Sequence, residues 1–247
     1  MKDITKHIVS FSGGKDSTTM LLLMVEKGYH IDEILFLDTG VEFPQMYKHI
    51  KKVEEYINKP ITILKAEHSF EYMMFDYVKK KGKNKGQKGY SWADFRNRWC
   101  TKYFKQHLMK VYLRNKYGKK ANIIQYVGLA CEEMKRVNRK NRDVLYKLNY
   151  PLVEWDITEN MALDYCYKKG FNWDGLYDKF KRVSCWCCPL QSIGDLRTLY
   201  NDFPELWEKL KQWDNKTYRK FRADYSVEEL EAKFEKEKLQ VYKKNKI

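Results

Sequence analysis

Short apolar runs alternate with amphipathic stretches along the first half of the chain. The runs at residues 7–11, 31–37, 61–64 and 122–129 have the length and apolar content of buried strands. Between them, residues 17–27, 45–58 and 101–117 place apolar side chains at helical spacing, and Gly28 closes the first of these helices. Strands that alternate with helices are typical of a doubly wound, mainly parallel sheet, so the predicted fold class is α/β.

The second half of the chain has a helical pattern. Thr158 is expected to cap a helix that runs to about residue 169, where Gly170 ends it, and the charged segment from residue 202 onward reads as an amphipathic helical element. We predict an α/β domain over residues 1–190 and a helical C-terminal extension over residues 191–247. The first residues lead into a strand without a signal pattern, and no apolar run approaches the roughly 18–20 residues that span a bilayer. We therefore expect a cytoplasmic protein without a membrane partner.

The turn after the first predicted strand has the composition of a phosphate-binding loop. Its two glycines let backbone N–H groups converge on an anion, the following helix adds the positive end of its dipole, and Lys15 adds a charge. The spacing differs from the P-loop of many nucleotide hydrolases, because Val9 lies five positions before Gly14 and Asp16 follows the lysine. The nucleotide-binding residues predicted in this segment are Ser10, Ser12, Gly13, Gly14, Lys15, Asp16, Ser17 and Thr18.

A polar turn follows the second predicted strand, beginning with Asp38 and Thr39 and ending at Pro44. The carboxyl ends of parallel strands share one edge of a sheet, and ligands bind at that edge. Asp38, Thr39 and Gly128, which closes a later strand, therefore join the predicted nucleotide site. A carboxylate that only caps its own turn is the alternative for Asp38.

The chain has a large excess of basic residues. The 247 residues include 48 Lys and Arg against 33 Asp and Glu, a formal charge of +15, which favours nucleic acid or a multiply phosphorylated small ligand as a partner. A densely charged, solvated surface explains the same balance. Residues 79–90 contain six lysines and three glycines, and they predict a mobile loop that is either a lid, a nucleic-acid contact or a plain solvated loop.

The six cysteines are more typical of metal ligands or catalytic thiols than of disulfides in a reducing compartment. Cys185 and Cys188 have CxxC spacing, which lets two thiolates chelate one metal from a tight turn. The predicted metal ligands are Cys100, Cys185, Cys187 and Cys188, holding an iron–sulfur cluster or a zinc ion, with unligated buried thiols as the alternative. Cys166 is expected in the core, and Cys131 is a candidate nucleophile because it follows a strand end.

Taken together, these motifs resemble the phosphoadenosine phosphosulfate reductase family over roughly residues 7–190. The resemblance rests on the Ser-Gly-Gly-Lys-Asp-Ser loop, which is similar to the PP-loop of ATP pyrophosphatases, on the 38–44 turn, and on the segments at 98–101 and 185–189. It implies an adenine nucleotide alpha hydrolase-like fold that binds ATP or a related adenine nucleotide with Mg²⁺. It also implies a [4Fe-4S] cluster, with Zn²⁺ as the alternative.

The resemblance leaves two chemistries open. Assimilatory reductases of the family attack the sulfonucleotide with a cysteine near the C-terminus in a Glu-Cys-Gly context, which this sequence lacks, whereas ATP pyrophosphatases need no such thiol. We therefore expect AMP-forming adenylation, with Lys15 stabilising the departing pyrophosphate, Asp16 anchoring the metal or a water, and Asp38 near the ribose or Mg²⁺. The expected use is sulfur transfer or nucleic-acid modification, with tRNA, DNA, a sulfur- or electron-donor protein, or a second copy of the chain as partner. A sulfite-producing reductase and a non-catalytic nucleotide or nucleic-acid binding module are the alternatives.

Overall fold

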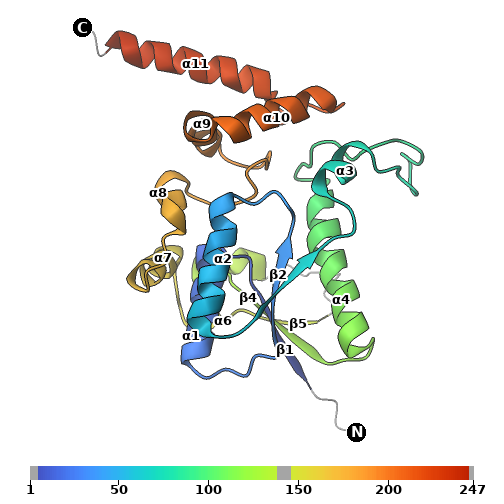
Figure 1. Cartoon of the computed structure of the whole chain (residues 1–247), viewed down its shortest axis with the longest axis vertical. Helices are drawn as coiled ribbons and strands as arrows, with labels where there is room; N and C mark the ends of the chain where they lie inside the picture. The colour runs from blue at the N-terminus through green and yellow to red at the C-terminus, as the bar shows by residue number, and fades with distance from the viewer. Residues whose placement is uncertain (1–4, 138–145, 245–247) are drawn as a thin grey trace. The chain divides into compact units, whose positions relative to one another are not determined.

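The computed structural model describes residues 5–137 and 146–244 and divides into two compact units (Figure 1). Unit 1 consists of Met1–Ala66 and Tyr103–Leu176, and unit 2 of Glu67–Lys102 and Tyr177–Ile247. This division differs from the predicted boundary at residue 190. The chain leaves unit 1 after the third strand and returns to it at Tyr103, so the 79–90 loop and the segments that contain Cys100 and Cys185 belong to unit 2.

Unit 1 is built on one parallel sheet of five strands in the order β3-β2-β1-β4-β5. The strands are β1 (Lys6–Ser10), β2 (Glu33–Asp38), β3 (Ile61–Lys65), β4 (Ile123–Val127) and β5 (Lys147–Asn149). Ser10 at the end of β1 pairs with Leu35 on one side and with Val127 on the other. The predicted α/β class with a doubly wound parallel sheet is confirmed. Strand β5 was not predicted, because its three residues contain no apolar run.

Helices cover both faces of this sheet (Figure 1). On one face, Met109 and Leu113 of α4 (Leu108–Tyr117) pack with Ile8, Leu35, Leu64 and Ile123 from four strands. The opposite face is covered by α1 (Lys15–Glu26) and α2 (Pro44–Ile57), and α7 (Glu159–Lys168) packs along α1. The predicted helix at 101–117 begins as a π-helix, η1 (Thr101–His107), and continues as α4. The short elements of unit 1 are η2 (Cys131–Glu133), α5 (Met134–Val137), α6 (Pro151–Glu154) and η3 (Trp173–Gly175).

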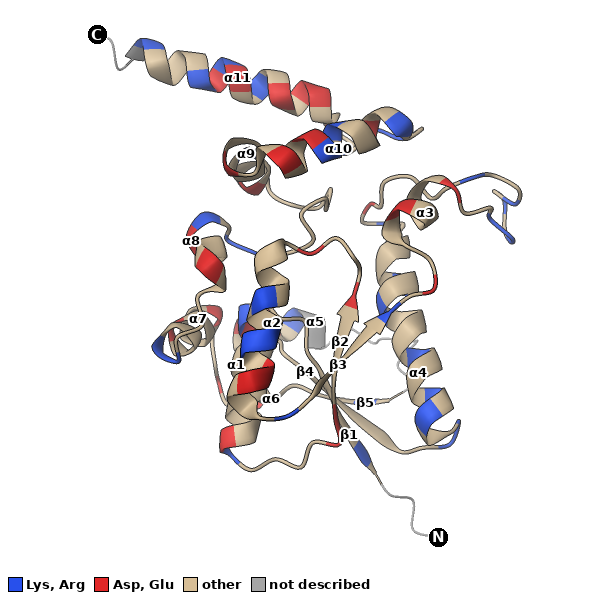
Figure 2. Cartoon of the chain, viewed as in Figure 1, with Lys and Arg blue, Asp and Glu red and all other residues tan. Residues whose placement is uncertain are grey.

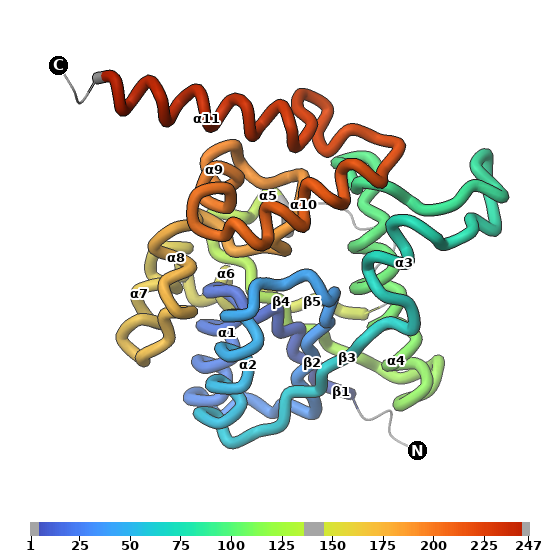
Figure 3. The backbone as a smooth tube through the Cα atoms, turned by 45° about the horizontal axis from the view of Figure 1, so that its top comes forward, coloured from blue at the N-terminus to red at the C-terminus, as the bar shows by residue number. Residues whose placement is uncertain are grey.

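Unit 2 is helical and rich in aromatic residues. Its helices are α3 (Phe70–Phe75), α8 (Leu176–Lys179), α9 (Ile193–Asp202), α10 (Pro204–Lys216) and α11 (Val227–Lys244). Helices α9, α10 and α11 lie against one another (Figure 3), with Phe234 of α11 in ring contact with Tyr200 and Trp207. Phe70 stacks on Trp213 at 5.8 Å, so the loop-rich part that starts at residue 67 shares a core with α10. The predicted helical character of the C-terminal part is confirmed.

Among the described residues, no helix combines the length and the apolar character needed to cross a bilayer.

Candidate active site

The turn between β1 and α1 occupies the switch point of the sheet. The neighbours of β1 are β2 on one side and β4 on the other, so chain order reverses here, and ligands of open parallel sheets bind in the crevice at such points. Gly13 has a φ of +76°, a conformation that favours glycine, and its carbonyl accepts a hydrogen bond of 2.7 Å from the indole of Trp173. The loop conformation is therefore fixed both by its own glycine and by a side chain from η3.

Gly128 holds the end of β4 directly against this loop. A Cβ atom at Gly128 would lie 2.7 Å from the Cα of Ser17 and 2.8 Å from the Ser17 nitrogen, both backbone atoms. Glycine is thus required for β4 to pack on the first turn of α1. The structure gives this residue, predicted as a nucleotide contact, a packing role that positions the loop.

The hydroxyl groups of the loop divide into two sets. Ser12 is exposed, and its hydroxyl lies 3.0 Å from that of Ser17, which in turn donates to the carbonyl of Gly14 at 3.0 Å. Thr18 is fully buried, and its hydroxyl lies 2.9 Å from Nε2 of His49. Ser12 therefore faces solvent at the rim, whereas Thr18 supports the loop from inside.

His49 was not predicted as part of the site. Burial lowers its pKa to about 3, and its ring stacks on Trp173 with centroids 4.3 Å apart. A neutral imidazole between Thr18 and Trp173 completes the support behind the loop. The sequence gives little indication of this role, because His49 occupies a position on the buried face of α2 that any core residue could fill.

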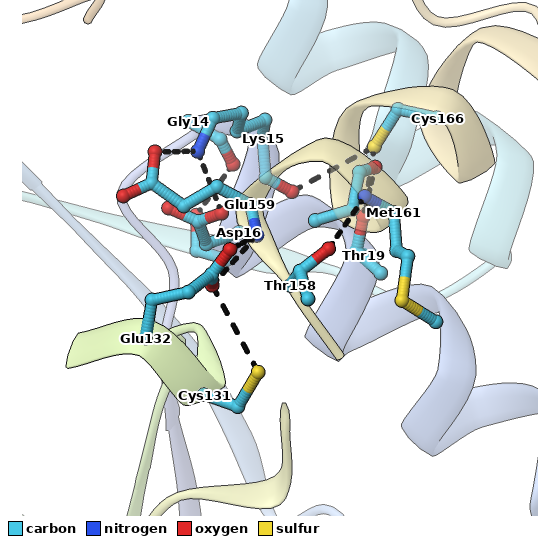
Figure 4. Close-up of polar contacts among 12 residues, drawn as sticks. Gly14, Lys15, Asp16, Thr19, Cys131, Glu132, Thr158, Glu159, Met161 and Cys166 are labelled. Carbon is cyan, nitrogen blue, oxygen red and sulfur yellow. Dashed lines mark hydrogen bonds and ion pairs between the residues drawn. The ribbon is translucent and has the colours of Figure 1, made fainter. Parts of the chain in front are cut away.

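Lys15 carries a buried charge beside the first turn of α1. The residue is 7% exposed, and its Nζ donates to Oδ1 of Asp16 at 2.9 Å and to Oε2 of Glu159 at 2.7 Å (Figure 4). Burial disfavours the ammonium ion, but the hydrogen bonds to Glu159 and Asp16 outweigh it and raise the pKa of Lys15 above its ordinary value. The site thus holds a permanent cation.

Glu159 is the main residue of the site that the sequence did not indicate. It is the first residue of α7, directly after the N-cap Thr158, and its backbone N–H donates to the Glu132 carboxylate at 3.0 Å (Figure 4). The predicted Thr158 cap is confirmed, because its side chain accepts from the Met161 N–H. Acidic residues are common in the first turn of a capped helix. The sequence around Glu159 therefore does not indicate that its carboxylate pairs with a lysine 144 positions away.

Asp16 lies between the lysine and two further carboxylates. Burial raises its pKa, Lys15 counteracts that effect, and the charges of Glu159 and Glu133 add to the increase. Within residues 5–137 and 146–244, no group of three or more potential ligand side chains has an arrangement that fits a metal ion.

Asp38 sits at the end of β2 and is 6% exposed. One oxygen, Oδ1, accepts from the Gly40 N–H and from the Tyr47 hydroxyl, both at 2.8 Å, and Lys65 Nζ lies 3.7 Å from Oδ2. The Thr39 hydroxyl donates to Glu42 at 2.9 Å within the same turn. These contacts hold the Asp38 carboxylate in place at the carboxyl edge of the sheet.

The two thiols of unit 1 have raised pKa values. Burial raises the pKa of Cys166 to about 12, and its Sγ lies 3.1 Å from the Thr19 hydroxyl inside the core. Desolvation and then the Glu132 carboxylate raise the pKa of Cys131. A nucleophilic cysteine is normally activated by a lowered pKa, so neither thiol has the electrostatic setting of a thiolate.

All four predicted metal ligands, Cys100, Cys185, Cys187 and Cys188, lie in unit 2. The 185–188 segment forms a tight turn in which the Cys188 N–H donates to the Cys185 carbonyl at 3.1 Å, and the Gln191 amide donates to the Cys185 and Trp186 carbonyls. Cys187 is 2% exposed, while Cys100, Cys185 and Cys188 are half-buried. Burial, followed by the nearby Cys100 thiol, raises the pKa of Cys188. Cys100 lies within electrostatic range of Cys188, and Cys187 lies in the interior. In the described part of the chain, these thiols are not arranged as a finished metal centre.

The protein-family model that describes the phosphoadenosine phosphosulfate reductase domain matches residues 6–191 of the chain. The chain belongs to this family. The match begins at β1 and extends through the 185–188 turn of unit 2. The loop between β1 and α1 and the segments that contain Cys100 and Cys185 therefore all lie within the matched region.

Relatives among curated proteins are uncharacterised. Two proteins of Methanocaldococcus jannaschii are 29% identical over 217 residues and 28% identical over 205 residues, which cover 84% and 81% of this chain but 40% and 45% of the relatives. A nin-region protein of Escherichia phage lambda is 35% identical over 63 residues, 25% of this chain and 22% of its own length. The family member described here thus spans less than half of the length of these relatives.

The solved structures that are similar to the chain include two of related fold. One is the phosphoadenylyl-sulfate reductase of Candida auris in a phosphate complex, with a TM-score of 0.47 and 16% identity over 72% of this chain and 81% of the other. The second is the U34-tRNA thiolase NcsA of Methanococcus maripaludis with its [4Fe-4S] cluster, with a TM-score of 0.45 and 14% identity over 87% and 73% of the two chains.

Proposed function

We propose that this member of the reductase-domain family binds ATP at the turn between β1 and α1 and catalyses its cleavage at the α-phosphate. The main support for the proposal is the position of Lys15. Its side chain is a buried cation at the N-terminal end of α1, at the switch point of the sheet. Backbone amides, the positive end of a helix and a fixed ammonium ion together favour a polyphosphate over a neutral ligand.

In the proposed reaction, an acceptor oxygen attacks the α-phosphorus of MgATP. The bond between that phosphorus and the bridging oxygen to the β-phosphate breaks, and pyrophosphate leaves with the electron pair. Lys15 exchanges the carboxylates of Glu159 and Asp16 for phosphate oxygens and stabilises the charge that develops on the leaving group. Asp16 is proposed to anchor magnesium or a water, and Asp38 to act near the ribose or the magnesium ion from the adjacent turn.

Sulfonucleotide reduction is the competing activity within the family. A reductase needs a thiolate that attacks the sulfonucleotide, and the two thiols of unit 1 have raised pKa values. Adenylation requires no thiol, so the raised thiol pKa values of Cys131 and Cys166 are compatible with it. A protein that binds nucleotide without turnover is the third candidate.

We further propose that the half-buried thiols Cys100, Cys185 and Cys188 hold an iron–sulfur cluster, or else zinc. Thiolates suit both groups, and the tight 185–188 turn supplies two of them at chelating spacing. When bound, a cluster carries electrons or positions sulfur, whereas zinc stabilises the local fold. Iron, sulfide and zinc quantitation of anaerobically purified protein decides between them.

The binding step is tested by titrating ATP with Mg²⁺ into the full chain, wild type and Lys15→Met, by calorimetry. Methionine keeps the buried stem packed and removes the charge. Lys59→Met is the matched control, because Lys59 is an exposed lysine of the same unit. We expect Lys15→Met to weaken binding at least about tenfold, in keeping with a charge-assisted hydrogen bond, and Lys59→Met to bind as the wild type does. Equal affinities of the two variants would contradict the assignment.

A parallel assay addresses the competing activity. Production of sulfite from phosphoadenosine phosphosulfate with reduced thioredoxin, without pyrophosphate release from ATP, would establish a reductase instead. Binding of ATP with turnover of neither substrate would establish the nucleotide-binding module.

A further inference from the structure

Unit 2 contains a second buried lysine, whose charge has no carboxylate partner among the described residues. Lys79 is 7% exposed, and its Nζ donates to the Tyr218 hydroxyl at 3.0 Å and to Oε1 of Gln87 at 3.5 Å. The same ammonium ion lies 5.5 Å and 5.3 Å from the ring centroids of Tyr90 and Tyr218. No ion pair in the described parts of the chain involves Lys79, whereas Lys15 of unit 1 has two. Because a buried charge is unfavourable unless it is paired, Lys79 marks a place where an anion is expected.

The lysine-rich loop around Lys79 has a defined form that its composition did not predict. Val78 and Lys88 form an antiparallel bridge, and the Lys79 N–H donates to the Gln87 carbonyl at 3.0 Å while its carbonyl accepts from Gly86 at 2.8 Å. The loop is therefore a small hairpin that follows α3, with lysines concentrated along it (Figure 2). Lys81 and Lys83 at its tip are exposed and form no ion pair within the described chain.

This hairpin forms one wall of a groove of about 600 Å³. The charged and aromatic residues that line the groove are Lys79, Lys81, Lys83, Tyr90, Tyr218 and Arg219. Arg219 is paired with Asp94, so the net charge of the groove comes from its three lysines. Tyr218 is 63% exposed, which leaves most of its ring accessible above the buried ammonium ion.

A further exposed aromatic residue lies beside the groove in the chain. Phe95 is 70% exposed, and the Arg96 guanidinium lies 5.2 Å from the centroid of its ring. In the sequence, Phe95 is two positions before Asn97, which lines the groove. Cations for phosphates and open aromatic faces for bases are the two components of sites that bind single strands. One small anion would use the lysines and leave both rings without a role.

We propose that this groove, formed by the hairpin at 79–90 and by Tyr218, binds a single-stranded segment of nucleic acid. The hairpin lysines contact successive phosphates, and an unstacked base lies on the Tyr218 ring. A duplex keeps its base faces stacked inside and engages the lysines alone. All of these groups belong to unit 2, so the inference goes beyond the proposed ATP chemistry of unit 1 and does not depend on it.

The test measures the binding of fluorescein-labelled oligo(U) and oligo(dT) 15-mers, and of a duplex of equal length, to the full chain by fluorescence anisotropy across a salt series. The charge variant is Lys81→Gln/Lys83→Gln. Its matched control is Lys236→Gln/Lys243→Gln, which removes the same charge from exposed positions of α11. The ring variants are Tyr218→Leu and Tyr218→Phe, and the exposure of Tyr218 leaves the core intact in both.

We expect both single strands to bind more tightly than the duplex. The Lys81→Gln/Lys83→Gln variant should reduce the slope of log K against log salt by about 1.4, two contacts at roughly 0.7 each, with no comparable change in the α11 control. Tyr218→Leu should weaken binding at least about fivefold, and Tyr218→Phe should retain the stacking contribution. A preference for oligo(U) would identify RNA as the natural strand, and a preference for oligo(dT) would identify DNA.

Equal losses in the two double-lysine variants, unchanged affinity in Tyr218→Leu, or duplex binding as tight as single-strand binding would each overturn the inference. Lys15→Met distinguishes this proposal from the proposed function, because it should weaken ATP binding at least about tenfold and leave oligonucleotide binding unchanged.

Discussion

Replacing Gly128 by alanine is the sharpest perturbation of the candidate site. The new methyl group would point at the backbone of the first turn of α1, 2.7 Å from the Cα of Ser17 and 2.9 Å from the carbonyl carbon of Asp16. Backbone atoms cannot rotate out of the way as a side chain can. The end of β4 and the loop before α1 must therefore separate.

The size of the effect follows from these distances. Ordinary van der Waals contact begins at 3.4 Å, so the Ser17 backbone has to move by about 0.7 Å, the difference between 3.4 and 2.7 Å. Overpacking of this kind destabilises by about 1–3 kcal/mol. If the free energy of unfolding falls by roughly 2 kcal/mol for each molar of urea, a loss of about 2 kcal/mol lowers the urea midpoint by about 1 M. The shift also displaces the loop, and ATP binding should weaken roughly tenfold.

The assay is urea unfolding followed by circular dichroism, together with ATP titration of the folded variant. Gly194→Ala is the matched control, because its Cβ would meet the Ser192 hydroxyl oxygen at an unstrained 3.6 Å and alanine favours the helix α9 by about 0.5–1 kcal/mol. If Gly128→Ala has the stability and the ATP affinity of the wild type, then β4 does not press on the loop and the geometry described for the site is wrong.

Further predictions concern single residues. Glu159→Gln removes one carboxylate that competes for Lys15, so ATP binding measured by calorimetry should tighten by up to about tenfold at low salt; weaker binding would refute the competing role. The unfolded chain protonates His49 near pH 6.5 while the folded chain holds it neutral down to about pH 3, so stability is lost as pH falls below about 6.5. Urea unfolding at pH 7 and pH 5 should show a loss of about 2 kcal/mol that is absent in His49→Gln, and equal pH dependence in both proteins would be the contrary result. Cys131→Ser should leave AMP formation within about twofold of the wild type, because its thiol pKa is raised, whereas a loss of activity above about 100-fold would make Cys131 a nucleophile. Cys188→Ser should abolish metal binding, measured as iron and zinc content, and an unchanged content would exclude this residue as a ligand.

Local motifs explain why the strand-to-helix turn of the candidate site could be predicted. The loop from Ser12 to Ser17 is contiguous, and its glycines, lysine and position after an apolar run all indicate one strand-to-helix turn. The parallel sheet followed from regular alternation of strands and helices over 130 residues. Both signals depend on neighbours in the chain.

The residues that escaped prediction act over long distances in sequence. Glu159 reaches Lys15 across 144 positions, and Tyr218 reaches Lys79 across 139. Neither partner differs in its own segment from an ordinary first-turn glutamate or an exposed tyrosine. Their roles arise from the fold, which one sequence does not specify at the level of side-chain pairs.

The place of residues 67–102 in unit 2 was not predicted, for a similar reason. The segment at 67–102 has no periodic pattern of its own, and it joins the C-terminal helices through contacts such as Phe70 on Trp213. Composition identified the lysines at 79–90, but it gave no indication of the hairpin or of the buried position of Lys79.

Product analysis addresses the proposed cleavage of ATP at the α-phosphate with the help of Lys15. The full chain is incubated with Mg²⁺ and ATP labelled at the α-phosphorus, with single-stranded oligonucleotide as acceptor, and the products are separated for wild type and Lys15→Met. We expect pyrophosphate together with labelled AMP or adenylated oligonucleotide from the wild type, and loss of these products in Lys15→Met. Formation of ADP and inorganic phosphate, or AMP formation that is equal in both proteins, would contradict it.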